Sequence, residues 1–188
     1  MFRMGGFRMS DMQPKTAQAT PQTGPGQLSA LEVQRAVERL RGEQNLLAGL
    51  GAGAVAALIG AVLWAVITNV TGYEIGFMAI GVGFIVGYAV RVVGKGLDQT
   101  FAIGGAVLAL LGCVVGKALA ILAIIASQEG LTYADVWSQI DLPTMANLMT
   151  STFSPIDLVF YGIAIYEGYK LSLRQVTDAE LRAAARGR

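Results

Sequence analysis

The sequence contains no histidine and a single cysteine, Cys113. These shortages exclude disulfides within the chain, and they remove the residues of His-based and Cys-based metal sites and of Cys-His nucleophiles. Charged residues are also scarce, at 14% of the 188 residues against roughly 25% in a typical soluble domain. We therefore expect a protein that is not an enzyme and that holds no cofactor and no metal.

A strong charge of one sign is missing as well. The formal net charge is +1, and the basic residues are spread over several segments instead of forming one cluster, which argues against nucleic acid as a partner. Residues 1–28 contain no apolar run typical of a cleavable signal peptide. Their Met, Gln, Thr, Gly and Pro composition predicts a flexible tail.

Apolar residues are abundant and are arranged in long runs. They make up 54% of the chain, and the mean hydropathy is +0.54. Four runs have lengths close to the roughly 17 to 25 residues that a helix needs to cross a bilayer. The sequence therefore predicts an all-α membrane protein with a four-helix transmembrane domain over residues 46–173. The predicted spans are residues 46–68, 75–93, 101–126 and 156–173.

Short polar helices are predicted on both sides of this domain. Ser29 followed by Glu32 fits a capping box, and Leu31 opens a run with apolar residues at helical spacing. Thr177 followed by Glu180 repeats the capping pattern near the C-terminus. We expect an amphipathic juxtamembrane helix over residues 29–45 and a cytoplasmic C-terminal helix within residues 174–188.

The segment between the third and fourth spans, residues 127–155, is too long for a turn. Pro143 is well placed to begin a short helix in it. Ser154 and Asp157 favour the start of the fourth span, because they supply a cap and an acidic residue at the positive end of the helix dipole.

The distribution of lysine and arginine predicts the orientation. Of the 14 basic residues, 13 lie in the N-terminal region, at Arg91 and Lys95, or from Lys170 onward. The positive-inside rule then places both termini and the middle loop in the cytoplasm. The four helices form two hairpins that each run in-out-in.

The first and third spans resemble each other. Residues 53–62 match residues 105–114 at seven of ten positions without a gap. A parallel internal repeat about an axis along the membrane normal would produce this match. A shared composition of small residues would produce it too, and the sequence leaves both explanations open.

Glycines four residues apart are the most frequent motif of the spans. In lipid this spacing allows the backbones of two helices to approach closely. The motifs predict packing surfaces either within the four-helix unit or between subunits. The candidate packing residues are Gly49, Gly53, Gly83, Gly87, Gly112 and Gly116.

Two charges fall within the apolar runs, Lys117 in the third and Glu167 in the fourth. A charge at this depth costs about 2.5 to 3.5 kcal/mol on insertion scales, so we predict that the two residues form an ion pair inside the bundle. Such a pair would lock two helices together, or it would relay a proton or an ion; contact of the charges with a lipid headgroup or another subunit is a further alternative.

Glu74 and Asp157 lie near the outer surface, where they form a weak cation site or are simply solvated.

Three stretches, residues 71–76, 81–87 and 161–170, resemble a loosely defined set of uncharacterised bacterial four-helix integral membrane proteins. The resemblance extends over about residues 46–173. It implies the bacterial inner membrane as the location, and the set has no assigned activity to transfer.

The sequence is compatible with two functions. The first is a non-enzymatic, multi-pass membrane subunit that contacts membrane lipids and uses its glycine-rich helix faces to form a homo-oligomer or to join a larger membrane complex. The alternative is an ion or proton channel or transporter that uses Lys117 and Glu167.

Overall fold

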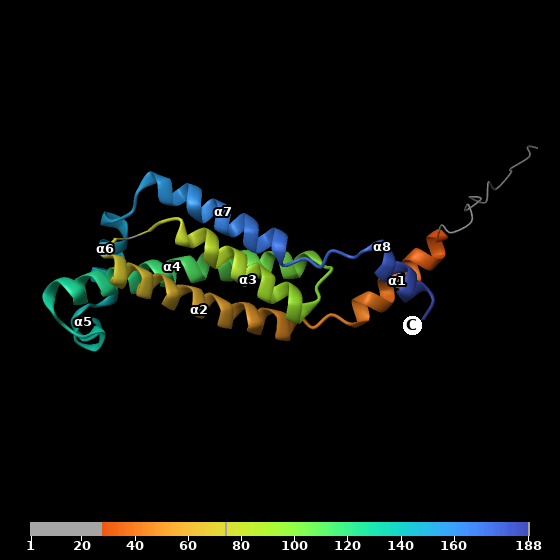
Figure 1. Cartoon of the computed structure of the whole chain (residues 1–188), viewed down its shortest axis with the longest axis horizontal. Coiled ribbons are helices and arrows are strands. Elements are labelled where there is room, and N and C mark those ends of the chain that lie inside the picture. The colour runs from red at the N-terminus through yellow and green to blue at the C-terminus, as the bar shows by residue number, and fades with distance from the viewer. Residues whose placement is uncertain (1–27, 74, 188) are drawn as a thin grey trace, which may run out of the picture.

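The computed structural model describes residues 28–73 and 75–187, and these residues form helices and connecting segments with no strand. Four helices lie lengthwise in a bundle, α1 and α8 pair beyond one end of it, and α5 and α6 lie at the other end (Figure 1). The all-α class is therefore confirmed. The bundle helices are α2 (Leu46–Thr71), α3 (Met78–Gly94), α4 (Gln99–Glu129) and α7 (Pro155–Leu171); the others are α1 (Ala30–Gly42), α5 (Tyr133–Gln139), α6 (Leu142–Ser151) and α8 (Asp178–Ala185).

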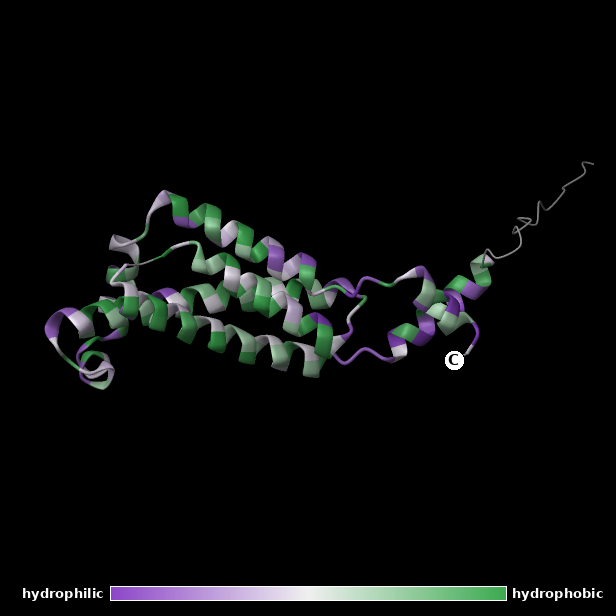
Figure 2. Ribbon diagram, viewed as in Figure 1, coloured by the Kyte–Doolittle hydropathy of each residue, from purple (hydrophilic) through white to green (hydrophobic). Residues whose placement is uncertain are grey.

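The number of membrane spans is confirmed only in part. By length and composition, α2 with 26 residues and α4 with 31 residues are able to cross a membrane. A third span is obtained if α6 and α7, which meet at a bend of 104°, are counted together. α3 is apolar but has only 17 residues. Apolar residues dominate the bundle, whereas polar residues gather on α1, α8 and the connections to them (Figure 2).

Local capping signals explain most helix ends. The capping boxes predicted at Ser29 with Glu32 and at Thr177 with Glu180 are both present. α2 and α4 end at Gly72 and Gly130, with φ of 70° and 64°, a left-handed conformation that glycine adopts without strain. Both helices run past the outer ends predicted for their spans, and at 1.5 Å per residue α4 is about 46 Å long. The predicted flexible tail over residues 1–28 falls, except for Leu28, outside the described residues.

The segment between α4 and α7 holds two helices where the sequence predicted one. α6 is the helix expected near Pro143, and α5 begins at a capping box formed by Thr132 and Asp135. Both pack on the C-terminal part of α4 (Figure 1). A separate apolar cluster joins the three helices and contains Leu122, Ala126, Val136 and Met145.

Within the bundle, helices meet at small residues. α3 lies so close to α7 that a Cβ added to Gly83 would be 2.7 Å from the Cα of Ala164. All six glycines proposed as packing residues face another helix or loop of the same chain. Gly49 faces Gly94, Gly53 faces Val90 and Leu108, Gly83 faces Ala164, Gly87 faces Leu171, Gly112 faces Val82 and Ala57, and Gly116 faces Trp64.

The close approach of α3 and α7 predicts that substitution of two glycines of α3 will affect stability differently. Gly83→Ala forces the two backbones apart and should destabilise the bundle by about 1 to 3 kcal/mol, as overpacking does. Gly81→Ala is the matched control, because no atom lies within 4 Å of the added Cβ. Reversible unfolding in detergent measures both variants, and equal stabilities would contradict the packing described.

Candidate functional site

A charged side chain is buried at the end of the bundle nearest α6. Lys117 of α4 is 2% exposed. Its Nζ donates to Oδ2 of Asp157 at 3.1 Å and to the backbone carbonyl of Thr152 at 3.3 Å. The ring of Phe153 lies 5.8 Å from Nζ, within reach of a cation-π interaction. The charge is therefore compensated by a carboxylate, a carbonyl and an aromatic face.

Asp157 is positioned by the start of α7. It is the third residue of that helix and is 7% exposed. Its Oδ2 also accepts a hydrogen bond from the backbone N–H of Ser154 at 3.0 Å, and the positive end of the helix dipole favours a carboxylate at this place. Gly76, just before α3, lies against the other oxygen: a Cβ added to it would be 3.1 Å from Oδ1.

The ion pair borders a cavity of about 200 Å³ between the start of α7 and the segment before α3. The lining combines the two charges with backbone and apolar groups. Its residues are Gly76, Lys117, Thr152, Ser154, Ile156, Asp157 and Phe160.

The structure corrects the predicted pairing of Lys117 with Glu167. Glu167 is half-buried on α7, ten residues beyond Asp157, which is about 15 Å along the helix. No ion pair joins it to Lys117 within the part of the chain that the structure describes. Its backbone carbonyl instead lies against Gly87 of α3.

The register of α4 against α7 explains the error. Gly105 and Gly168 meet, because a Cβ on Gly168 would be 2.8 Å from the carbonyl oxygen of Gly105. Lys117 is 12 residues beyond the first glycine, and Asp157 is 11 residues from the second, so both lie about 17 Å from the crossing. Counting from predicted span centres missed this match, because α4 extends farther beyond the crossing of Gly105 and Gly168 than α7 does. Only the structure shows that these two glycines meet, so the sequence gave no signal that identifies Asp157 as the partner.

Glu74 and Asp157 were predicted to form a weak cation site or to be solvated near the outer surface, and the structure describes only Asp157 of the two. Asp157 is the partner of a buried lysine and is not an acid of the solvated surface. Glu74 lies outside the described residues.

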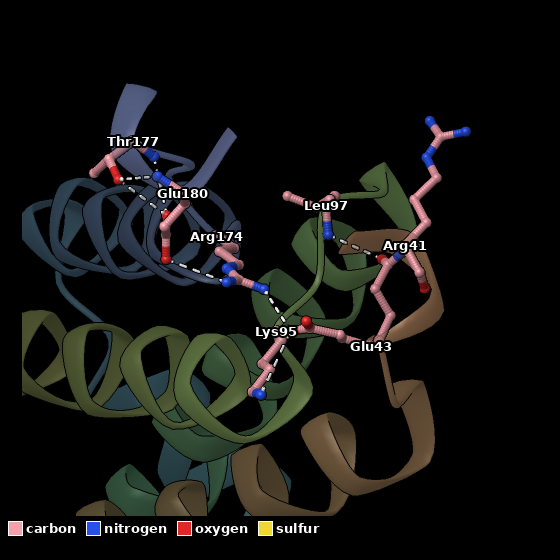
Figure 3. Close-up of polar contacts among 8 residues, drawn as sticks. Arg41, Glu43, Lys95, Leu97, Arg174, Thr177 and Glu180 are labelled. Carbon is pink, nitrogen blue, oxygen red and sulfur yellow. Dashed lines mark hydrogen bonds and ion pairs between the residues drawn. The ribbon is translucent and has the colours of Figure 1, made fainter. Parts of the chain in front are cut away.

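A second charged cluster holds α1 and α8 against the opposite end of the bundle (Figure 3). Arg174, which follows α7, is the centre of this cluster. Its guanidinium binds Glu43 before α2 and Glu180 of α8, with nitrogen to oxygen distances of 3.2 Å in both pairs. Lys95 pairs with Glu43 at 3.6 Å, and Arg41 pairs with Asp98 at 3.4 Å. Three connections of the chain are therefore tied together by ion pairs.

These contacts shift two pKa values. The backbone N–H of Thr177 and the side chain of Arg174 both bond the carboxylate of Glu180 and lower its pKa. Partial burial lowers the pKa of Arg174, but hydrogen bonds to Glu180 and Glu43 outweigh it and the pKa is raised. The ionised forms of both residues therefore stabilise the position of α8.

In residues 28–73 and 75–187, no group of three His, Cys, Asp or Glu side chains is placed to hold a metal ion. No protein-family model, curated protein sequence or solved structure matches this chain. The resemblance to bacterial four-helix membrane proteins stays a prediction.

A double-mutant cycle distinguishes the two possible partners of Lys117. Lys117→Met and Asp157→Asn should each cost about 3 kcal/mol of unfolding free energy, because each removes one side of a buried ion pair. Their coupling energy should exceed about 1 kcal/mol, while Lys117→Met with Glu167→Gln should be additive to within about 0.5 kcal/mol. Unfolding in mixed detergent micelles provides the values, and a larger coupling to Glu167 would refute the observed pairing.

Acid should loosen α8 through Glu180. Its pKa is lowered in the folded protein, so its contribution is complete above the usual carboxyl range and is lost as the pH falls through the folded pKa. Since the pair is partly solvated, we expect the protection factors of the α8 amides, which are corrected for the intrinsic exchange rate at each pH, to fall only about two- to fivefold between neutral pH and about pH 3. Arg174→Gln should show much of this fall already at neutral pH, and unchanged protection factors would contradict a role for the cluster.

Proposed function

We propose that this chain is a non-enzymatic integral membrane protein that crosses the bacterial inner membrane four times. Four helices, α2, α3, α4 and α7, lie side by side along a common axis, and this arrangement supports the topology (Figure 1). α3 and α7 have 17 residues each, which meets the lower limit of about 17 for a span. Large apolar side chains such as Leu58, Phe84 and Val159 are exposed on the outside of the bundle, where lipid would cover them.

The proposed orientation places α1 and α8, and hence both described ends of the chain, in the cytoplasm. Among the described residues, every lysine and arginine except Lys117 lies on α1 or α8, in the loops at that end of the bundle, or at the helix ends next to them. This distribution supports the orientation by the positive-inside rule.

Within the membrane, the proposed role is that of a subunit that assembles with further helices, either of other copies or of a larger complex. One observation is its main support: an apolar groove of about 240 Å³ runs between α2 and α4 near the middle of both helices. Buried Ala57 and Gly112 lie deep in it, and Leu58, Leu111 and Val115 are exposed beside them. A groove with small residues at its base accepts the side-chain ridge of another helix.

The proposed contact surface differs from the glycine-rich helix faces that the sequence predicted. The six candidate packing glycines were predicted to pack either within the four-helix unit or between subunits, and all six face neighbours in their own chain. The groove is formed by other residues of α2 and α4, with Gly112 as the shared position. Its lining residues are Ala54, Ala57, Leu58, Leu108, Leu111, Gly112 and Val115.

Movement of an ion or a proton past Lys117 and Glu167 has less support. The two residues lie at different levels, and the cluster between the helices consists of apolar residues such as Trp64, Val86 and Cys113. A single bundle packed in this way offers no polar route among its described residues.

Native mass spectrometry of the protein in membrane-derived nanodiscs tests the assembly. We expect more than one copy, or one copy with a stoichiometric partner. Ala54→Leu fills the groove and should weaken the assembly by about tenfold or more. Gly162→Leu is the control, because it adds a leucine to an open face of α7, which does not contact α2.

A mass corresponding to one chain without a partner would refute the assembly. Equal loss of assembly in both variants would show that the α2–α4 groove is not the contact surface.

A further inference from the structure

The apolar surface of the bundle is longer on some helices than on others. On α2 it extends from Leu47 to Val70, which are 85% and 79% exposed, with no charged residue between them. Val70 is 23 residues beyond Leu47, which is about 35 Å at 1.5 Å per residue. With the proposed crossing of the membrane, on which this inference rests, α2 therefore covers the roughly 30 Å of a hydrocarbon core in full.

On α3 and α7 two charges limit the apolar surface at the cytoplasmic end. Arg91 of α3 is partly exposed, and Lys170 of α7 is exposed. Both helices end in the cytoplasm in the proposed orientation, and helical side chains lean toward the N-terminus of their own helix. The two charges therefore lean into the membrane, and their side chains add nothing to the apolar length.

The backbone limits the apolar surface at the other end. Residues 75–77, before α3, and residues 152–154, before α7, are not helical. Phe77 and Phe153 in these segments are 59% and 39% exposed, so the rest of the chain does not cover them. Lipid-exposed backbone outside a helix is not tolerated within hydrocarbon, because its polar groups have no partners there. These two segments therefore lie at the level of the lipid headgroups.

The two limits leave a short apolar surface on the α3–α7 face. Arg91 is 14 residues beyond Phe77, and Lys170 is 14 residues beyond Ile156. Each distance is about 21 Å along the helix, roughly 9 Å less than a hydrocarbon core.

The register of α2 against α3 places the two surfaces relative to each other. Gly60 of α2 faces Val82 of α3, so Val66 of α2 and Phe77 of α3 are about level. The apolar surface of α2 continues four residues farther, to Val70, whereas that of α3 ends at Phe77. Figure 1 shows the same offset, since α3 and α7 begin short of the far ends of α2 and α4.

A bilayer of one thickness does not fit both surfaces. Matching α2 would bury charges and non-helical backbone of the α3–α7 face in hydrocarbon, and matching α3 and α7 would expose apolar side chains of α2 to water. A bilayer adapts its local thickness to the apolar length of the protein at modest cost.

We propose that the bundle thins the bilayer along its α3–α7 face, where the bordering lipids extend over about 21 Å instead of the roughly 30 Å of an unperturbed hydrocarbon core.

Spin labels that report the depth of single positions test this proposal. Phe77→Cys and Val66→Cys place labels at exposed and about level positions of α3 and α2. Both are made in the full chain with Cys113→Ala and reconstituted in dioleoyl phosphatidylcholine. The ratio of collisions with oxygen and with a nickel chelate gives the depth. We expect the label at Phe77→Cys among the headgroups and the label at Val66→Cys about 5 Å deeper.

A second pair of labels, at the cytoplasmic end, distinguishes thinning from a tilt of the bundle. Gly49 faces Gly94, so Gly51 of α2 and Val92 of α3 are level, and both are exposed. With thinning, the label at Val92→Cys is no deeper than the label at Gly51→Cys. A tilted bundle would instead move Val92→Cys toward the membrane centre as Phe77→Cys leaves it.

Longer acyl chains provide a further measurement. In dierucoyl phosphatidylcholine the bilayer is thicker, so the label at Val66→Cys should move several ångströms deeper while the label at Phe77→Cys stays among the headgroups. Equal depths of these two labels in either lipid overturn the proposal. A label at Val92→Cys that is deeper than the label at Gly51→Cys overturns it as well, because tilt then accounts for the difference.

The outcome is separable from the proposed function. Depth is measured at single positions and does not count chains, so a single chain in native mass spectrometry refutes assembly alone. Equal depths at the level positions, with all four labels still in contact with lipid, refute thinning alone. Four labels that all report water would instead refute the crossing of the membrane.

Discussion

The arrangement of the bundle depends on direct contact between helix backbones at small residues. Gly83 lies on the backbone of Ala164, and Gly105 lies on Gly168, so α7 is held close to both α3 and α4. In lipid the hydrophobic effect does not drive helices together, and close packing of this kind is the main source of their association. Because backbone contacts tolerate little sliding, they also fix the level at which more distant side chains meet.

The buried ion pair is a consequence of that fixed level. Lys117 and Asp157 are equally far from the Gly105–Gly168 crossing, and this brings a charge from the middle of the longest helix to the first turn of a short one. A lysine buried at this place would be unfavourable without a carboxylate. The start of α7 supplies one that already accepts a backbone hydrogen bond from Ser154. Packing and electrostatics therefore support the same register.

Much of the fold was predictable because its signals are local. The apolar runs identified the bundle helices, and the capping boxes at Ser29 and Thr177 identified the starts of α1 and α8. The partner of Lys117 was not predictable in this way, since it depends on the register of helices that are distant in sequence. α5 was missed because a helix of seven residues leaves almost no periodic pattern. The packing role of each glycine was not predictable for the same reason, because it depends on which helix the glycine faces.

The pairing of α1 with α8 joins the first and last described helices of the chain. The guanidinium of Arg39 donates to the carbonyl of Ala184 at 2.8 Å, across 145 positions of sequence. During synthesis, α1 leaves the ribosome before the bundle helices, and α8 leaves it after them. The contact between α1 and α8 can therefore form only after every helix between them has been made, so it is among the last tertiary contacts that the described chain completes.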